Sequence, residues 1–219
     1  VITNLWNAGN RQNQAKGVMR QPIVKFQNQF DDYVDTLTPI QKLGLNETTG
    51  TTLENTGSNI NTSFAISGSN YTRGTSVPTI NRYAYNFTNK NTYVTAQYST
   101  ATNSYSDNTQ TISTYAKIGS VTGSDVQIIA AYGLGGGIYG IGLSLFANAS
   151  GPYLAIIPTA NPANIYTLAS GSTSYFGDYH LYTCVRNGTS IKLYIDGKVI
   201  ASGTYSAYNF TDSGYGAIG

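Results

Sequence analysis

Few residues of this 219-residue sequence carry side chains suited to catalysis. It contains one histidine, His180, and one cysteine, Cys184. Four positions apart on a β-strand, these two side chains would share a face at a separation of about 13 Å. A nucleophile and its general base must lie within hydrogen-bond reach, so this pair does not form one. We predict that His180 is a structural residue at the start of a strand.

Carboxylates offer a second route to chemistry. The two glutamates are Glu47 and Glu54, and glycoside cleavage needs two carboxyl groups roughly 5–9.5 Å apart. The turn-rich residues 48–52 between them allow such a distance but do not require it. We expect no catalysis from this pair.

Motifs for metals and cofactors are missing or incomplete. A structural zinc site needs four Cys or His ligands, more than this sequence has. Gly135, Gly137 and Gly140 match the G-x-G-x-x-G pattern of dinucleotide sites, but strand-like residues follow and the next acid is Asp178. We therefore predict that the protein is not an enzyme and has no cofactor. Calcium stays open as the alternative, although no specific residues support it.

The composition is that of an exposed β protein. Charged residues make up 10% of the chain, against roughly 25% in an average soluble domain, and 28 Thr, 20 Ser and 21 Asn supply the polar surface instead. A net charge of +2 is too small to indicate a nucleic-acid partner. Residues 128–147 are uncharged, but their glycines disfavour a membrane helix, so we predict two strands, Val126–Tyr132 and Ile138–Ala147, joined by a glycine loop at Gly133–Gly137.

The first 25 residues differ from the rest. They are rich in Asn and Gln, carry four basic residues and contain no acid. We interpret residues 1–25 as an extended basic arm that contacts other subunits; a frayed terminus is the alternative. Apolar residues then fall on one helical face over 26–37, which predicts a short helix. Asp31, Asp32 and Asp35 lie on its solvent-exposed face. Thr38-Pro39 ends this helix. The predicted assembly contacts are Trp6, Arg11, Lys16, Arg20, Lys25, Phe26 and Phe30.

From Ile40 onward the pattern is strand and turn. Ile191, Leu193 and Ile195 alternate with polar residues, and Asp196-Gly197 suits a two-residue type I′ turn. We predict a hairpin over Lys192–Ser202 with the three alternating residues on a buried face. The turn-rich residues 55–61 and the glycine loop are expected at the ends of the sheets.

Four stretches together resemble the laminin-G-like, concanavalin A-like jelly-roll domains. They are Leu37–Thr52, with its L-G-x-x-x-x-x-G-T-T ending, Ala84–Val94, Gly177–Gly188, and Ile191–Gly203, which reads I-K-L-Y-I-D-G-K-V-I-A-S-G. The resemblance covers about residues 37–219. It implies an all-β antiparallel β-sandwich jelly roll over 38–219.

The resemblance implies a binding or structural module. The E-x-D-x-E-type strand of the glycosidases of this broader fold is absent. The sequence also departs from the family pattern: Tyr179 stands where the family usually has Trp, and Thr88 and Thr92 stand where it often has Asp. The segment Tyr33–Pro39, which leads into the predicted sandwich, resembles the start of modules found in phage virion proteins. We therefore expect a virion tail, fibre or capsid-decoration protein, located in the virion or outside the cell, that is a homo-oligomer or part of a larger assembly and contacts host glycans. The alternative is a carbohydrate-binding module of a secreted or cell-surface bacterial protein.

In that family, the stretch similar to Tyr215–Gly219 is followed by about two more strands. The sequence therefore favours a sandwich that lacks its last strands, with a native chain that continues past Gly219. Two alternatives would also cover the edge at Ile40–Leu45: a strand donated by a neighbouring chain, or the arm itself.

Overall fold

The structure is a computed structural model in which the described residues are organised as strands and turns. The chain divides into two compact units: a smaller one of Val1–Ser63 with Asn70–Thr88, and a larger one of Phe64–Ser69 with Asn89–Gly219. The predicted arm 1–25, the helix 26–37 and all seven predicted assembly residues lie outside the described residues. The structure describes residues 43, 47, 49–54, 56–57, 64–69, 71–77, 82–87, 93–97, 109–134, 141–157, 166–205 and 215–218.

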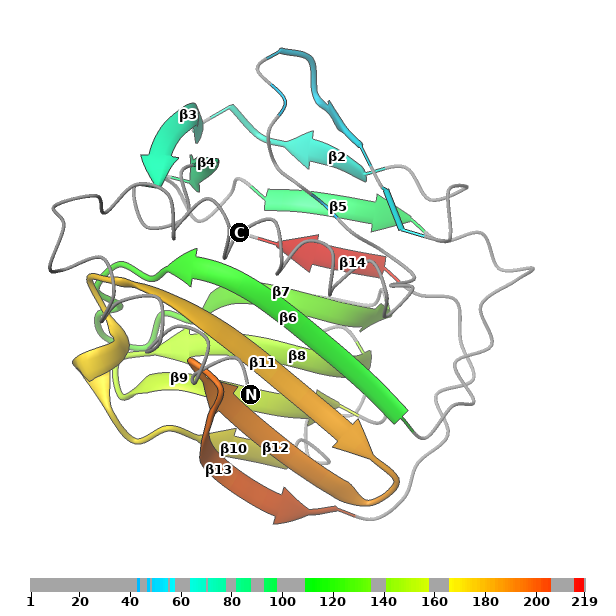
Figure 1. Cartoon of the computed structure of the whole chain (residues 1–219), viewed down its shortest axis with the longest axis vertical. Helices are drawn as coiled ribbons and strands as arrows, with labels where there is room; N and C mark the ends of the chain where they lie inside the picture. Colours follow the sequence, from blue (N-terminus) through cyan, green and yellow to red (C-terminus); the bar gives the residue numbers. More distant parts are fainter. Residues whose placement is uncertain are drawn as a thin grey trace, which may run out of the picture. The chain divides into compact units, whose positions relative to one another are not determined.

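The larger unit is a sandwich of two sheets (Figure 1). One sheet runs in the order β2 (Phe64–Ser67), β5 (Tyr93–Gln97), β14 (Tyr215–Ile218), β7 (Gln127–Leu134), β8 (Ile141–Asn148), β9 (Gly151–Ile157), β10 (Tyr166–Ala169). The other has four strands in the order β13 (Lys198–Thr204), β12 (Ser190–Ile195), β11 (Tyr179–Asn187), β6 (Thr109–Lys117). The strand pairs within both sheets are antiparallel. This arrangement confirms the predicted all-β sandwich.

The core lies between the two sheets, because the two central strands of the smaller sheet, β11 and β12, bury alternate residues. Tyr182 and Cys184 of β11 are fully buried, and Leu193 of β12 is 0% exposed. They belong to one apolar cluster with Leu145 of β8 and Leu154 of β9. Burying a side chain of this size stabilises a fold by about 1.5–3 kcal/mol, so the inward residues of β11 and β12 hold the two sheets together.

The β12–β13 hairpin forms as predicted. Ile191 and Ile195 are each 2% exposed, on the same face as Leu193. Asp196 and Gly197 at the turn have φ angles of 52° and 76°, the left-handed conformation that a type I′ turn requires of both central residues. A register shift after Leu193 marks an irregularity that the alternation alone does not reveal.

One glycine falls in a strand where a loop was predicted. Gly133 belongs to β7, where it pairs with Gly142 of β8 and with Tyr215 of β14. Backbone hydrogen bonds on both sides of a central strand outweigh the weak strand preference of glycine. The predicted strands at Val126–Tyr132 and Ile138–Ala147 are present with shifted ends. Residues 135–137 of the predicted glycine loop and 138–140 of the second predicted strand lie outside the described residues.

The first residues of β9 hold the segment that leads into a short 3₁₀ turn, η2 (Thr173–Tyr175). Ser170 N–H donates to the carbonyl of Pro152 at 2.8 Å. Gly151 has φ +123°, and a Cβ there would collide with the carbonyl oxygen of Ser172. Only glycine tolerates both conditions, so this close approach sets the position of η2 relative to β9.

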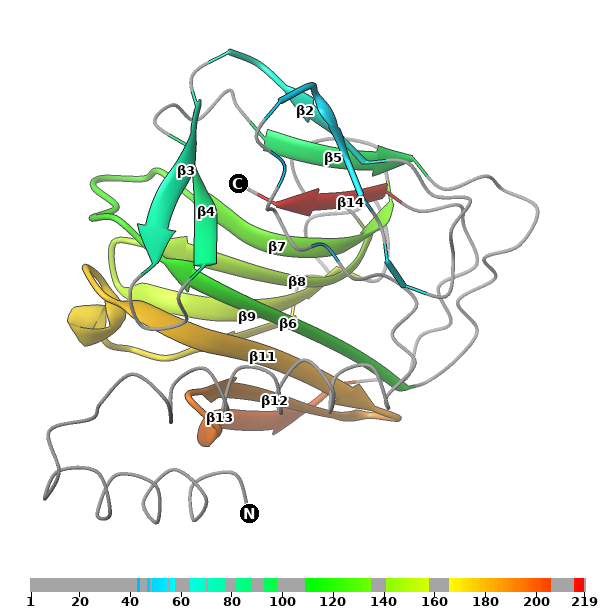
Figure 2. The ribbon, with the colours of Figure 1, turned by 45° about the horizontal axis from the view of Figure 1, so that its top comes forward.

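The smaller unit contains β1 (Thr52–Leu53) and an antiparallel pair, β3 (Tyr71–Val77) and β4 (Arg82–Phe87) (Figure 2). Thr72 pairs with Asn86 and Thr75 with Ala84. Two residues of β3 therefore oppose one of β4, which is a β-bulge. Among the described residues no helix is long and apolar enough to span a bilayer.

Truncation of Leu193 tests the role of the buried face. Leu193→Ala should lower the free energy of unfolding by roughly 2–5 kcal/mol, because the fully buried leucine leaves a cavity. Val199, which is 50% exposed, provides the control: Val199→Ala should change stability by about 0.5 kcal/mol or less. Urea denaturation measures both. Equal losses in the two variants would show that β12 packs by a different face.

Candidate functional site

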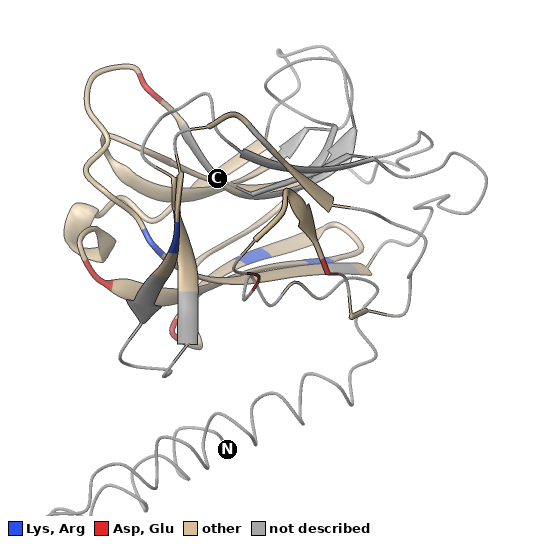
Figure 3. Cartoon of the chain, turned by 90° about the horizontal axis from the view of Figure 1, so that it is seen from above, with Lys and Arg blue, Asp and Glu red and all other residues tan. Residues whose placement is uncertain are grey.

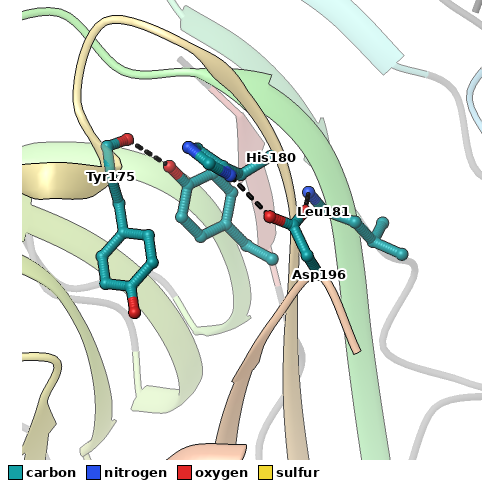
Figure 4. Close-up of polar contacts among 5 residues, drawn as sticks. Tyr175, His180, Leu181 and Asp196 are labelled. Carbon is teal, nitrogen blue, oxygen red and sulfur yellow. Dashed lines mark hydrogen bonds and ion pairs between the residues drawn. The ribbon is translucent and has the colours of Figure 1, made fainter. Parts of the chain in front are cut away.

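His180 sits at the start of β11, as predicted, and contacts the turn between β12 and β13. Its Nδ1 lies 2.6 Å from Oδ2 of Asp196, and Oδ1 of the same carboxylate accepts the backbone N–H of Leu181 at 2.9 Å (Figure 4). The backbone N–H of Asp196 in turn donates to the carbonyl of Leu181 at 2.9 Å. One aspartate therefore ties the hairpin turn to β11 through three hydrogen bonds.

The histidine ring is enclosed by tyrosines. It makes edge contacts with Tyr175 at 5.6 Å and with Tyr182 at 6.0 Å between ring centroids. The hydroxyl of Tyr182 donates to the carbonyl of Tyr175 at 3.0 Å (Figure 4), which links η2 to β11. Burial, with the nearby Asp196 carboxylate, raises the pKa of Tyr182. These contacts give the His180–Asp196 pair a structural role in fixing the start of β11.

The other predicted candidates are also engaged in the fold. Cys184 is 0% exposed, and burial raises the pKa of its thiol, which disfavours the nucleophilic thiolate. Oε1 of Glu47 accepts the backbone N–H of Glu54 at 2.6 Å, so the structure joins Glu47 to the backbone of Glu54. Among the described residues, no three His, Cys, Asp or Glu side chains gather as they would around a metal ion.

The outward face of the four-stranded sheet carries a group of tyrosines and hydroxyls that the motifs did not indicate. Residues directly opposite each other on antiparallel strands share a face, and Tyr115 of β6 is opposite Leu181, while Thr183 is opposite both Ser113 and Tyr194. We call this set the tyrosine face; it comprises Ser113, Tyr115, Tyr179, Leu181, Thr183 and Tyr194. It lies opposite the buried side of β11, since Tyr182 and Cys184 alternate with its members.

The tyrosine face combines flat aromatic rings with polar hydroxyl groups. The rings of Tyr115 and Tyr179 stack with centroids 5.6 Å apart and planes at 12°. Beside them the hydroxyls of Ser113 and Thr183 hydrogen-bond at 2.9 Å. The three tyrosines are partly exposed, and charged residues are sparse on the described strands (Figure 3). A surface of ring planes next to hydroxyls suits a ligand that has both apolar ring faces and hydroxyl groups.

Sequence reasoning missed the tyrosine face because its members lie far apart in the chain. Tyr115 and Tyr179 are brought together by the pairing of β6 with β11, a register that local alternation does not specify. A signal was nevertheless present. Tyr179, Leu181 and Thr183 alternate with His180, Tyr182 and Cys184, so they face outward once β11 is a sandwich strand that buries Tyr182 and Cys184.

Comparisons with known proteins agree with this architecture. A laminin-G-type family model, described as the concanavalin A-like lectin/glucanases superfamily, matches residues 87–219. No curated protein matches the sequence.

Similar solved structures include binding domains of botulinum neurotoxins. The serotype D binding domain superposes with a TM-score of 0.62 at 14% identity, over 83% of this chain and 43% of that one. The serotype D ligand-binding domain in complex with N-acetylneuraminic acid gives a TM-score of 0.58 at 14% identity, over 83% and 42% of the two chains. This chain thus spans less than half the length of those structures, and the likeness shows a shared fold.

The buried hydroxyl of Tyr182 predicts a pH-dependent change in stability. At pH 8, Tyr182→Phe should cost roughly 0.5–1.5 kcal/mol through the lost hydrogen bond to Tyr175. Because the folded-state pKa is raised above the unfolded value of about 10, the contribution of Tyr182 is present in full below pH 10 and is lost as the pH rises above it.

Urea denaturation of the wild type and Tyr182→Phe at pH 8 and at pH 11 tests this. The stability difference between the two proteins should shrink or change sign at pH 11, since the hydroxyl of Tyr182 exists only in the wild type and ionises more readily in its unfolded state. A difference that stays constant over this range would contradict the burial of an un-ionised Tyr182.

Proposed function

The chain belongs to the concanavalin A-like lectin/glucanases superfamily, and on that premise we propose that it is a carbohydrate-binding protein whose tyrosine face contacts the glycan. The observation that carries this proposal is the stacked Tyr115–Tyr179 pair beside the Ser113–Thr183 hydroxyls on an outward sheet face. Aromatic planes pack on the apolar faces of sugar rings, and the hydroxyls exchange hydrogen bonds with sugar hydroxyls.

Binding is proposed rather than catalysis. His180 is held by Asp196 on one side and enclosed by tyrosine rings on the other, and Glu47 is bonded to the backbone of Glu54. A retaining or inverting glycosidase needs two carboxyl groups facing one another across the substrate. The tyrosine face itself contains no carboxylate, so it suits recognition of a glycan without its cleavage.

The finer proposal places this binding domain on a virion. The basic, acid-free residues 1–25 supply a segment suited to contacts with other subunits, and the sandwich would then face outward toward host glycans. The serotype D neurotoxin domains of similar fold are receptor-binding domains by name, which is the same kind of role. The alternative is a carbohydrate-binding module of a secreted or cell-surface bacterial protein, in which the arm has no assembly role.

Glycan-array binding tests the tyrosine face. The full chain should bind a subset of the glycans. Tyr179→Ala and Tyr194→Ala should each weaken that binding by several-fold to about tenfold, because an aromatic contact contributes roughly 0.5–1.5 kcal/mol to the binding free energy. Tyr166→Ala is the matched control, because Tyr166 is exposed on β10 of the other sheet. Equal binding by all variants, or no binding by the wild type, would contradict the proposal.

Deletion of residues 1–25 separates the virion proposal from the alternative. The shortened chain should keep the circular dichroism spectrum of the sandwich but remain monomeric under conditions where the full chain associates, because the arm would supply the contacts. Size-exclusion chromatography with light scattering measures this. Identical oligomeric states of the two chains would favour the isolated carbohydrate-binding module.

A further inference from the structure

A cation held over two aromatic rings lies in the smaller unit, which contains none of the strands of the tyrosine face. The guanidinium carbon of Arg73 is 5.3 Å from the ring centroid of Tyr71 and 5.5 Å from that of Tyr85. The two rings are themselves stacked at 6.1 Å, and Phe87 makes an edge contact with Tyr85 at 6.4 Å. We call these four residues, Tyr71, Arg73, Tyr85 and Phe87, the arginine cluster.

The β-bulge explains why the arginine is held in this way. Arg73 and Gly74 together oppose Tyr85 in the β3–β4 pair, and Gly74 has φ +70°, with open space where a Cβ would stand. A bulge bends its strand and re-aims the neighbouring side chain. The Nη2 of Arg73 donates to the hydroxyl of Tyr71 at 2.9 Å. The arginine is therefore ordered before any ligand arrives, which reduces the entropy cost of binding.

Tyr85 anchors the arginine cluster to the rest of the smaller unit. Tyr85 is 8% exposed, and its hydroxyl donates to the carbonyl oxygen of Glu47 at 2.9 Å. Oε1 of the Glu47 carboxylate accepts the backbone N–H of Glu54, and its Oε2 lies 3.4 Å from the hydroxyl of Tyr85. Within the described part of the chain, no carboxylate lies in ion-pair contact with Arg73. The hydrogen bond to Tyr71 uses one of the five N–H donors of the guanidinium.

From this geometry we infer that the arginine cluster is a subsite for an acidic saccharide, with Arg73 binding the sugar carboxylate and Tyr71 and Phe87 contacting the ring. A guanidinium fork matches a carboxylate in a two-point hydrogen bond that a lysine cannot reproduce. Tyr71, Arg73 and Phe87 are all partly exposed, so both the charge and the ring surfaces can reach a ligand. This extends the proposed glycan binding to a second surface on the other unit.

The test compares sugars that differ mainly in a carboxylate. Methyl galacturonoside and methyl galactoside, with the methyl glycoside of N-acetylneuraminic acid as a second acidic probe, are titrated into the full chain by isothermal calorimetry. At least one acidic sugar should bind about tenfold or more tightly than the neutral galactoside, as expected for a charge-assisted contact. Sodium acetate, a bare carboxylate, should bind more weakly than that sugar.

Variants assign this preference to Arg73. Arg73→Gln should abolish the preference for the acidic sugar, and Arg73→Lys should retain only part of it. Lys198→Gln, at an exposed position of the larger unit, should leave it unchanged. Loss of glycan-array binding in Tyr179→Ala reports on the tyrosine face and loss of the acidic preference in Arg73→Gln reports on the arginine cluster, so failure of the tyrosine-face proposal is distinguishable from failure of this one. Circular dichroism verifies that each variant folds. Equal affinity for acidic and neutral sugars, or a preference that survives Arg73→Gln, would overturn the inference.

Discussion

The alternation of side chains along β11 is the constraint on which the rest of the larger unit depends. Its inward residues, Tyr182 and Cys184, are fully buried against the second sheet. A slip of one residue in its pairing would expose these side chains and bury Tyr179 and Thr183 instead. The core therefore fixes the register of β11 with both β6 and β12. Presentation of the tyrosine face is a direct consequence of how the core packs.

Asp196 supports the same register from the end of the strand. A left-handed residue is required at this turn, and an aspartate there can accept the N–H of Leu181 while pairing with His180. The residues that resemble catalytic groups in the sequence thus serve to hold the strand that carries the outward tyrosines. The smaller unit uses a different device, a glycine-assisted bulge that orders Arg73 over two rings. Both surfaces are positioned by backbone features and involve few charged residues.

Features set by neighbours in sequence were predictable. The β12–β13 hairpin, its Asp-Gly turn and the buried Ile191, Leu193 and Ile195 follow from period-two alternation and turn chemistry, and the structure confirms them. The resemblance to concanavalin A-like domains predicted the sandwich, which the fold confirms. The structural role expected of His180 agrees with its contacts to Asp196 and two tyrosine rings.

Features set by long-range pairing were not predictable. The Tyr115–Tyr179 stack requires the register of β6 with β11, and the arginine cluster requires the bulge between β3 and β4. Arg186 is 1% exposed and lies 5.6 Å from the ring centroid of Tyr205; nothing local in the sequence distinguishes this buried cation from a surface one. Gly133 lies in a strand because partners on both sides pair with its backbone. Each of these depends on residues far away in the chain.

The central claim is that β11 divides its side chains between a core that fixes the register and an outward face that binds glycan. The most direct measurement is an NMR titration of the isotope-labelled full chain with the best-binding neutral glycan from an array, followed by the backbone amides and tyrosine ring signals. The account predicts that the largest shifts map to residues 113–115, 179–183 and 194, with the tyrosine rings responding most strongly. Shifts confined to other strands, or a uniform absence of shifts at saturating glycan, would contradict it.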